Sequence, residues 1–302
     1  MKRRDLFKGA AAVGVIAAIR SSSMGAAPAP AKGASLAPAP LKPPAKGSIP
    51  VAFLISDGAV VIDFCGPWEV FHHANVSGRD EAPFQLYTVA ESSKPVRASG
   101  GMMIVPTYTL ETAPPPKVTV IPAQGDHSDA VLNWIRKSAA TADLTMSVCT
   151  GAALLAKTGL LNGKSATTHH AAYKELALNF PDVHVKRGLR YVEDGKIASA
   201  GGLSSGIDLA LRVVERYYGR EAATQTAYGM EYQGEGWLKP ESNAVYAVVR
   251  PSKSGAPLCP VCDMETDPKD SPKSTFQGKT YYFCQPSHKT TFDADPKKWI
   301  DG

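Results

Sequence analysis

Residues 144–156 read Leu-Thr-Met-Ser-Val-Cys-Thr-Gly-Ala-Ala-Leu-Leu-Ala. The first five residues form a short apolar run of the kind found in buried strands of parallel sheets. The small and straight-chain residues that follow Cys149 favour a helix. This stretch therefore predicts a buried strand that runs directly into a helix, with Cys149 at the sharp turn between the two.

Short apolar runs alternate with helical spacing over residues 49–236. We predict strands at Ile49–Ile55, Phe84–Ala90, Lys117–Ile121 and Leu144–Val148, a short excursion at Met102–Val105, and a hairpin around Asp194-Gly195. Helices are expected at Gly66–Ala74, Ser128–Lys137, Tyr173–Asn179, Leu203–Tyr217 and Glu221–Tyr232. This alternation predicts a three-layer α/β domain with a mostly parallel sheet. The sequence has no glycine-rich phosphate-binding loop, so it predicts no nucleotide site.

The position of Cys149 indicates a chemical role. A cysteine at the start of a helix faces the N–H groups of the first helical turn. These groups and the helix dipole favour the thiolate over the thiol, and they stabilise negative charge that develops on a substrate. Cys149 is therefore the candidate nucleophile. A buried structural cysteine is the alternative that its position alone leaves open.

The amino-terminal part of the chain carries most of the net charge. The 302 residues include 33 basic and 28 acidic residues, and eight of the basic residues but only one acidic residue lie in 1–48. Residues 49–302 then hold 25 basic and 27 acidic residues. This nearly neutral remainder gives no indication of a nucleic-acid partner.

Residues 1–27 follow the plan of a signal peptide. Arg3-Arg4-Asp5-Leu6-Phe7-Lys8 resembles the twin-arginine export motif, and the uncharged run Gly9–Ile19 follows it. That run is much shorter than the roughly 20 residues that span a membrane, so we expect export to the periplasm and no membrane span. An uncleaved amphipathic helix is the alternative. Residues 28–48 contain six prolines and no aromatic residue, which predicts a semi-extended linker.

Three segments carry a family resemblance. Residues 147–169 read Ser-Val-Cys-Thr-Gly-Ala-Ala-Leu-Leu-Ala-Lys-Thr-Gly-Leu-Leu-Asn-Gly-Lys-Ser-Ala-Thr-Thr-His, residues 61–71 read Val-Ile-Asp-Phe-Cys-Gly-Pro-Trp-Glu-Val-Phe, and residues 200–210 read Ala-Gly-Gly-Leu-Ser-Ser-Gly-Ile-Asp-Leu-Ala. They resemble the DJ-1/PfpI superfamily, and its isonitrile hydratase branch above all. The resemblance covers about Pro50 to Tyr232. It implies a flavodoxin-like sandwich, a homodimer and no cofactor in this domain.

The resemblance also implies roles for four residues. Cys149 matches the nucleophile, and Asp63 matches the acidic partner beside the thiol, which serves as general acid and base. Thr150 would supply a backbone N–H and a hydroxyl, and His169 matches the histidine of the Thr-Thr-His motif. One departure concerns the residues after the predicted strand that ends at Ile121. The family usually has Gly-Gly there, with N–H groups facing the reaction site, whereas this chain has Ala123-Gln124.

The chemistry that this branch implies is the addition of water to a small-molecule isonitrile. The Cys149 sulfur adds to the terminal carbon, Asp63 delivers the proton, and water releases an N-substituted formamide from the resulting thioimidate. The superfamily also contains sensors whose cysteine is oxidised. It contains ligand-binding domains of transcription regulators as well, but an exported chain without a helix-turn-helix argues against that reading.

A second module follows a linker at 237–257. Residues 258–302 contain Cys259, Cys262, Cys284 and His288 in the spacing C-x2-C-x21-C-x3-H, which is typical of a closed tetrahedral metal site. The segment resembles a YHS domain, a small metal-associated α+β module. Zinc suits the geometry and copper(I) suits the thiolates. A disulfide is the alternative, because the periplasm is oxidising.

Two hypotheses about function result. In the first, the protein is an exported, isonitrile hydratase-like cysteine enzyme with one metal ion, zinc or copper, in its tail module. In the second, it is a non-enzymatic periplasmic metal or redox sensor, or a metal chaperone, that uses Cys149 and the tail cysteines.

Overall fold

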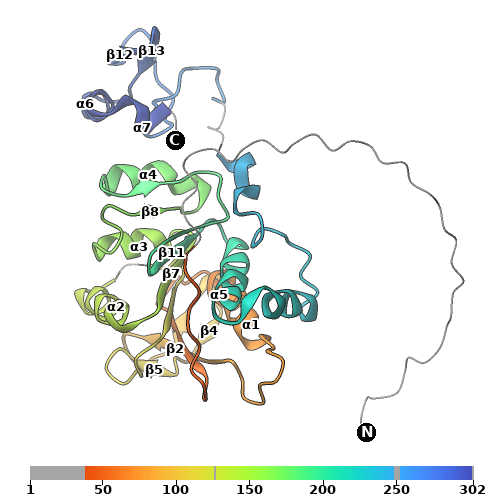
Figure 1. Cartoon of the computed structure of the whole chain (residues 1–302). Coiled ribbons are helices and arrows are strands. Elements are labelled where there is room, and N and C mark those ends of the chain that lie inside the picture. The colour runs from red at the N-terminus through yellow and green to blue at the C-terminus, as the bar shows by residue number, and fades with distance from the viewer. Residues whose placement is uncertain (1–37, 126, 248–251, 301–302) are drawn as a thin grey trace, which may run out of the picture. The chain divides into compact units, whose positions relative to one another are not determined.

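The computed structural model describes residues 38–125, 127–247 and 252–300 (Figure 1). The predicted signal peptide, residues 1–27, and the first part of the predicted linker lie outside these ranges. Residues 38–302 form one compact unit. None of the helices that the structure describes is both long and apolar enough to cross a membrane.

A seven-stranded sheet forms the centre of the fold (Figure 1). Its strands are β1 (Ile49–Leu54), β2 (Phe84–Ala90), β5 (Tyr108–Thr109), β6 (Val118–Ile121), β7 (Leu144–Val148), β10 (Tyr191–Asp194) and β11 (Ile197–Ala200). The order across the sheet is β10-β11-β7-β6-β1-β2-β5, and only the β10–β11 pair is antiparallel. Every residue of β6 and β7 is buried, as their continuous apolar sequences predict.

Three further strand pairs lie outside this sheet. They are β3 (Val96–Arg97) with β4 (Met103–Ile104), β8 (Ser165–Ala166) with β9 (His184–Val185), and β12 (Lys273–Phe276) with β13 (Lys279–Tyr282). The helices are α1 (Val61–His72), α2 (Asp129–Thr141), α3 (Gly151–Lys157), α4 (Tyr173–Asn179), α5 (Ser205–Gly229), α6 (Pro286–Ala294) and α7 (Pro296–Ile300). Short 3-10 turns occupy Ser99–Gly101, His170–Ala172 and Pro240–Tyr246.

Helices cover both faces of the sheet. Helices α1 and α5 pack on one face, where Phe53 of β1 belongs to the same apolar cluster as Phe71 and Leu209. Helices α2, α3 and α4 pack on the other face, where Leu54 joins Ile135 of α2 in a second cluster (Figure 1). The side chains of the neighbouring β1 residues Phe53 and Leu54 thus pack into the cores on opposite faces of the sheet, as the alternation of side chains along a strand requires. The predicted three-layer α/β sandwich is confirmed.

Two helices differ from the sequence prediction. Helix α1 begins at Val61 rather than at Gly66, so Asp63 lies in its first turn and Pro67 lies inside the helix. Helix α5 joins the two predicted helices at Leu203–Tyr217 and Glu221–Tyr232, but it is broken at Gly219, whose φ of 87° and ψ of 168° are not helical. The break shows why the sequence indicated two helices at this place.

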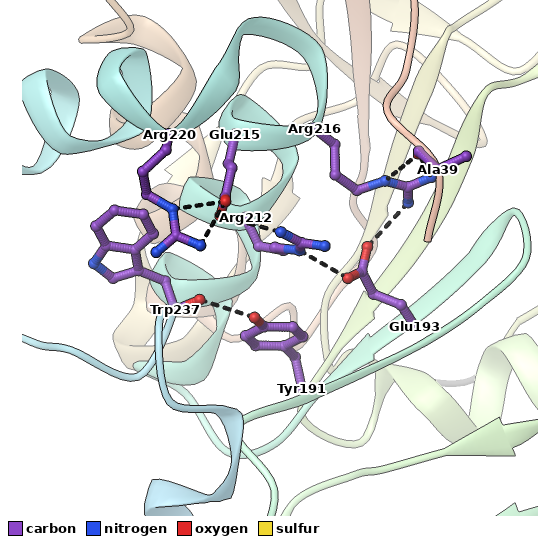
Figure 2. A network of polar contacts seen from close by, with 8 residues as sticks. All are labelled: Ala39, Tyr191, Glu193, Arg212, Glu215, Arg216, Arg220 and Trp237. Atoms are coloured by element: carbon purple, nitrogen blue, oxygen red, sulfur yellow. Dashed lines mark hydrogen bonds and ion pairs between the residues drawn. The ribbon is translucent and has the colours of Figure 1, made fainter. Parts of the chain in front are cut away.

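A network of buried charges ties β10 to α5 and to the amino-terminal segment (Figure 2). Glu193 accepts hydrogen bonds from Arg212 Nε at 2.9 Å and from Arg216 Nη1 at 3.0 Å. Arg216 also donates to the Ala39 carbonyl, at 3.1 Å from Nη2, and the Leu41 N–H donates to the Arg216 carbonyl. The described part of the predicted linker is therefore held against α5.

The tail module packs on α4. Cys259, Val261, Phe283, Phe292 and Trp299 form an apolar cluster that also includes Ala177 of α4. Lys174 of α4 forms an ion pair with Asp263, and Lys298 Nζ donates to the Pro181 carbonyl at 2.8 Å. The tail therefore shares its small core with the first domain, although a linker separates the two in the sequence.

We predict that Glu193→Ala lowers the free energy of unfolding by about 3–5 kcal/mol, because it leaves the buried guanidinium group of Arg216 without a carboxylate, whereas Arg212 keeps its pair with Glu215. Glu193 and Arg216 side chains are each 5% exposed. Urea unfolding measures the change. Glu235→Ala is the control, because the Glu235–Lys239 pair is largely exposed and its loss should leave the midpoint unchanged. Equal midpoints for both variants would contradict the assignment.

Candidate active site and metal centre

The turn between β7 and α3 holds Cys149 in a strained conformation. Its φ of 56° lies in the left-handed region, which residues other than glycine rarely adopt. The Cys149 N–H donates to the Gly201 carbonyl at 2.9 Å, and the Thr168 hydroxyl donates to the Cys149 carbonyl at 2.9 Å. These two hydrogen bonds connect the turn to the chain segments at Gly201 and Thr168 and hold it in place. The sequence analysis did not single out Thr168.

Four polar groups surround the Cys149 sulfur. The backbone N–H and the hydroxyl of Thr150 contact it, and so does the N–H of Leu203 from the turn before α5. Leu203 itself has a left-handed φ of 37°. The carboxyl group of Asp63 is the fourth neighbour. Sequence reasoning missed Leu203, because a backbone group contributed by an apolar residue leaves no signal in the residue types.

Asp63 reaches the sulfur from the first turn of α1 and is fully buried. Its Oδ2 accepts a hydrogen bond from the Ala123 N–H at 3.1 Å. Its Oδ1 is buried and accepts no hydrogen bond from a nitrogen or oxygen atom of the described residues. Burial disfavours the charged form and raises the pKa of Asp63 to about 6, against the opposing hydrogen bonds from Ala123 and Cys149.

Burial also raises the pKa of the Cys149 thiol, and the negative charge of Asp63 raises it further. The N–H groups of Thr150 and Leu203 oppose both effects without overcoming them. The expectation that the helix start favours a thiolate is therefore not met, since α3 is short and Cys149 is only 6% exposed. Cys149 and Asp63 instead form a buried pair in which the thiol holds the proton at neutral pH.

The two remaining predicted residues lie beside this pair. Thr150 is exposed and directly follows Cys149. His169 lies against the turn that carries Leu203, because a Cβ atom on Gly202 would come within 2.6 Å of the His169 Cδ2 atom. Its Nδ1 accepts from the Ala171 N–H at 3.2 Å. The His169 ring therefore packs against Gly202, in the turn that carries Leu203.

The segment after β6 is arranged around Asp63. The Ala123 N–H points at the Asp63 carboxylate, and the Ala123 carbonyl accepts from the Val60 N–H at 2.8 Å. Gln124 Nε2 donates to the Leu54 carbonyl at 3.2 Å. The backbone donors that contact the sulfur come from Thr150 and Leu203 instead.

The tail brings its four predicted ligands together. Cys259, Cys262, Cys284 and His288 each offer one ligand atom, and these atoms all lie within 4.8 Å of one another. The Cys262 and Cys284 sulfurs are 3.4 Å apart, and His288 Nδ1 lies 3.2 Å from the Cys284 sulfur. Sulfurs bound tetrahedrally to zinc at about 2.3 Å lie roughly 3.8 Å apart, so this donor set fits a metal ion. All five cysteines of the chain are free, and no disulfide competes for the ligands.

Comparisons with known proteins agree with this geometry. The model of the DJ-1/PfpI family matches residues 50–216. Isonitrile hydratase from Pseudomonas putida is 32% identical over 190 residues, which cover 61% of this chain and 79% of that protein. The HTH-type transcriptional regulator CdhR from Pseudomonas aeruginosa is 28% identical and covers 58% of this chain, but the match spans 52% of the regulator. A crystal structure of a THiJ/PfpI family protein from Pseudomonas syringae matches 66% of this chain and 84% of its own, with 26% identity and a TM-score of 0.55.

The raised pKa of Cys149 predicts slow alkylation at neutral pH. The rate with iodoacetamide should rise with pH through a midpoint above the ordinary thiol value of about 8.5. Asp63→Asn should move this midpoint to lower pH, because it removes the negative charge that opposes the thiolate. Peptide-resolved mass spectrometry separates Cys149 from the other cysteines. A midpoint below that of a free thiol, or an upward shift in the variant, would refute this electrostatic account.

Proposed function

Because the chain belongs to the DJ-1/PfpI family, we propose that it is an isonitrile hydratase-like enzyme that adds water to an isonitrile and releases an N-substituted formamide. The observation that carries the proposal is the buried Cys149–Asp63 pair, in which a thiol and a carboxyl group of raised pKa share one proton. Groups of this kind are suited to proton transfer near neutral pH.

The reaction begins with the transfer of the Cys149 proton to Asp63. The sulfur then adds to the terminal carbon of the isonitrile, and Asp63 returns the proton to that carbon, which yields a thioimidate. The N–H groups of Thr150 and Leu203 stabilise the sulfur while it carries negative charge. Water next adds to the thioimidate carbon, the carbon–sulfur bond breaks, and the formamide leaves with the thiol regenerated.

The sensor hypothesis receives less support at Cys149. Cysteines that act as redox sensors are exposed and have a low pKa. Cys149 is 6% exposed and its pKa is raised, so it has neither property. Its burial and its raised pKa both favour the enzyme over the sensor.

The tail module adds a metal site to this proposal. Cys259, Cys262, Cys284 and His288 would hold one ion, with zinc favoured by tetrahedral geometry and copper(I) by the thiolates. Burial raises the pKa of the Cys262 thiol to about 12 and also raises that of Cys284, so the ion must displace protons to bind.

Export and assembly complete the proposal. The twin-arginine motif in residues 1–27 supports a periplasmic location, which fractionation of the producing cell tests. Ile62 and Leu203, which neighbour Asp63 and the Cys149 sulfur, are 37% and 42% exposed. Exposed apolar side chains beside the site support a homodimer that covers it, which light scattering tests.

We expect the purified protein to convert a simple alkyl isonitrile to its formamide, as followed by chromatography. Cys149→Ala should abolish turnover, and Asp63→Asn should lower kcat by about 10²–10⁴. The ratio kcat/KM should fall as the pH drops through about 6, because a protonated Asp63 cannot accept the thiol proton. Cys65→Ser is the control, since Cys65 lies on α1 but has no role in the reaction. Turnover that survives Cys149→Ala would exclude this mechanism.

We expect one metal ion per chain, measured by elemental analysis, and Cys262→Ser should lower this content sharply. Metal removal by acid should expose residues 258–300 to protease, because a module with so small a core depends on its metal. Ala177 belongs to the tail cluster, so the amide protection of α4 should fall as well, while that of β6 and β7 stays high. A metal-free protein with a Cys259–Cys262 disulfide would overturn the metal site.

A further inference from the structure

A cavity of about 380 Å³ lies between the metal-binding turn of the tail and the first domain. The tail contributes Cys262 and Asp263 to its wall, and the first domain contributes Lys174 and Arg187. Tyr246 closes another side and stacks on His170, with 5.0 Å between the ring centroids. A proposed metal ligand and two cations from a different part of the chain thus line the same pocket.

Lys174 is bound closely to the metal-binding turn. Its residue is only 8% exposed, and its ammonium group pairs with the carboxylate of Asp263, which directly follows Cys262. The turn fixes Asp263 in a left-handed conformation with a φ of 61°, and the Asp263 N–H donates to the Cys259 carbonyl at 2.9 Å. The same turn that presents two thiolates therefore also presents the partner of Lys174.

The charges around the cavity do not balance within the first domain. Desolvation lowers the pKa of both Lys174 and Arg187, and the positive charge of Arg187 lowers that of Lys174 further. Asp263 of the tail offsets both cations, and Glu175, an exposed residue of α4, also lines the pocket. On the first-domain side, Lys174 and Arg187 thus exceed Glu175 by one positive charge.

The proposed metal centre carries the complementary charge. Three thiolates and a neutral imidazole around a divalent ion sum to one negative charge, and around copper(I) they sum to two. Mutation of groups that surround the ligands of a metal typically lowers its affinity by about 10–100-fold. Lys174 and Arg187 line the same pocket as Cys262, the one proposed ligand that reaches it.

We propose that Lys174 and Arg187 of the first domain are outer cations of the tail metal centre, which stabilise its thiolates and raise its metal affinity. The inference rests on the metal site proposed above. It makes the metal centre a composite of two modules, because the ligands come from the tail and the balancing charge comes from α4 and the segment after β9.

The test is the affinity of the full-length protein for Zn²⁺, measured by competition with a chromophoric chelator. Lys174→Met and Arg187→Gln should each weaken binding by roughly 10–100-fold, the range found when groups around metal ligands are removed. Arg187→Lys should keep most of the affinity, because it keeps the charge. Lys186→Gln is the matched control, since Lys186 is an exposed neighbour that does not line the cavity, and its affinity should not change. Near-ultraviolet circular dichroism of each Zn²⁺-saturated variant checks that the module is folded.

The outcomes separate this inference from the metal site itself. If wild-type protein binds Zn²⁺ and Cys262→Ser does not, but Lys174→Met and Arg187→Gln bind like wild type, the outer cations are refuted and the metal site stands. If Lys186→Gln loses as much affinity as Arg187→Gln, the effect is one of overall charge and the inference also fails. If wild-type protein binds no Zn²⁺, or Cys262→Ser binds it equally well, the metal site itself is refuted, and the inference falls with it.

Discussion

The close approach of α3 to the end of β6 is the constraint on which the active site depends. A side chain on Gly151 would collide with the carbonyl oxygens of Ile121 and Pro122, so only glycine permits this packing. The approach places Cys149 next to the chain that leaves β6, and Ala123 on that chain holds Asp63 through its N–H. Helices α1 and α3 lie on opposite faces of the sheet, yet their first turns meet at its carboxyl edge for this reason.

Much of this arrangement could be predicted from the sequence because the strands are fully buried. Short continuous apolar runs such as Val118–Ile121 and Leu144–Val148 indicate buried strands, and Cys149 directly follows the second of them. The predicted start of α1 was wrong by five residues, because Gly66-Pro67 resembles a helix start but lies inside the helix. The contact of the Leu203 N–H with the Cys149 sulfur could not be predicted from the sequence. Its position depends on a left-handed backbone at a residue whose type gives no sign of it.

Burial favours the protonated thiol at two separate places in the chain, at Cys149 and in the tail. At Cys149, burial and a neighbouring carboxylate favour the thiol, so the proposed reaction requires transfer of the thiol proton to Asp63. In the tail, burial also raises the pKa of Cys262 and Cys284, but there a metal cation would supply the charge that stabilises thiolates. At Cys149 desolvation outweighs the helix dipole, from which the sequence predicted a thiolate, because the residue is only 6% exposed.

The contact between tail and α4 changes how the two modules are to be understood. A linker in the sequence suggests separate cores, but a module of this size has too little apolar surface to be stable alone. Cys259, Val261 and Trp299 complete their cluster with Ala177, and Asp263 completes its charge with Lys174. Helix α4 follows directly on the His170–Ala172 turn and on His169, which supports the turn of Leu203 beside the Cys149 sulfur. One short segment of chain therefore contacts the tail module on one side and the turn beside Cys149 on the other.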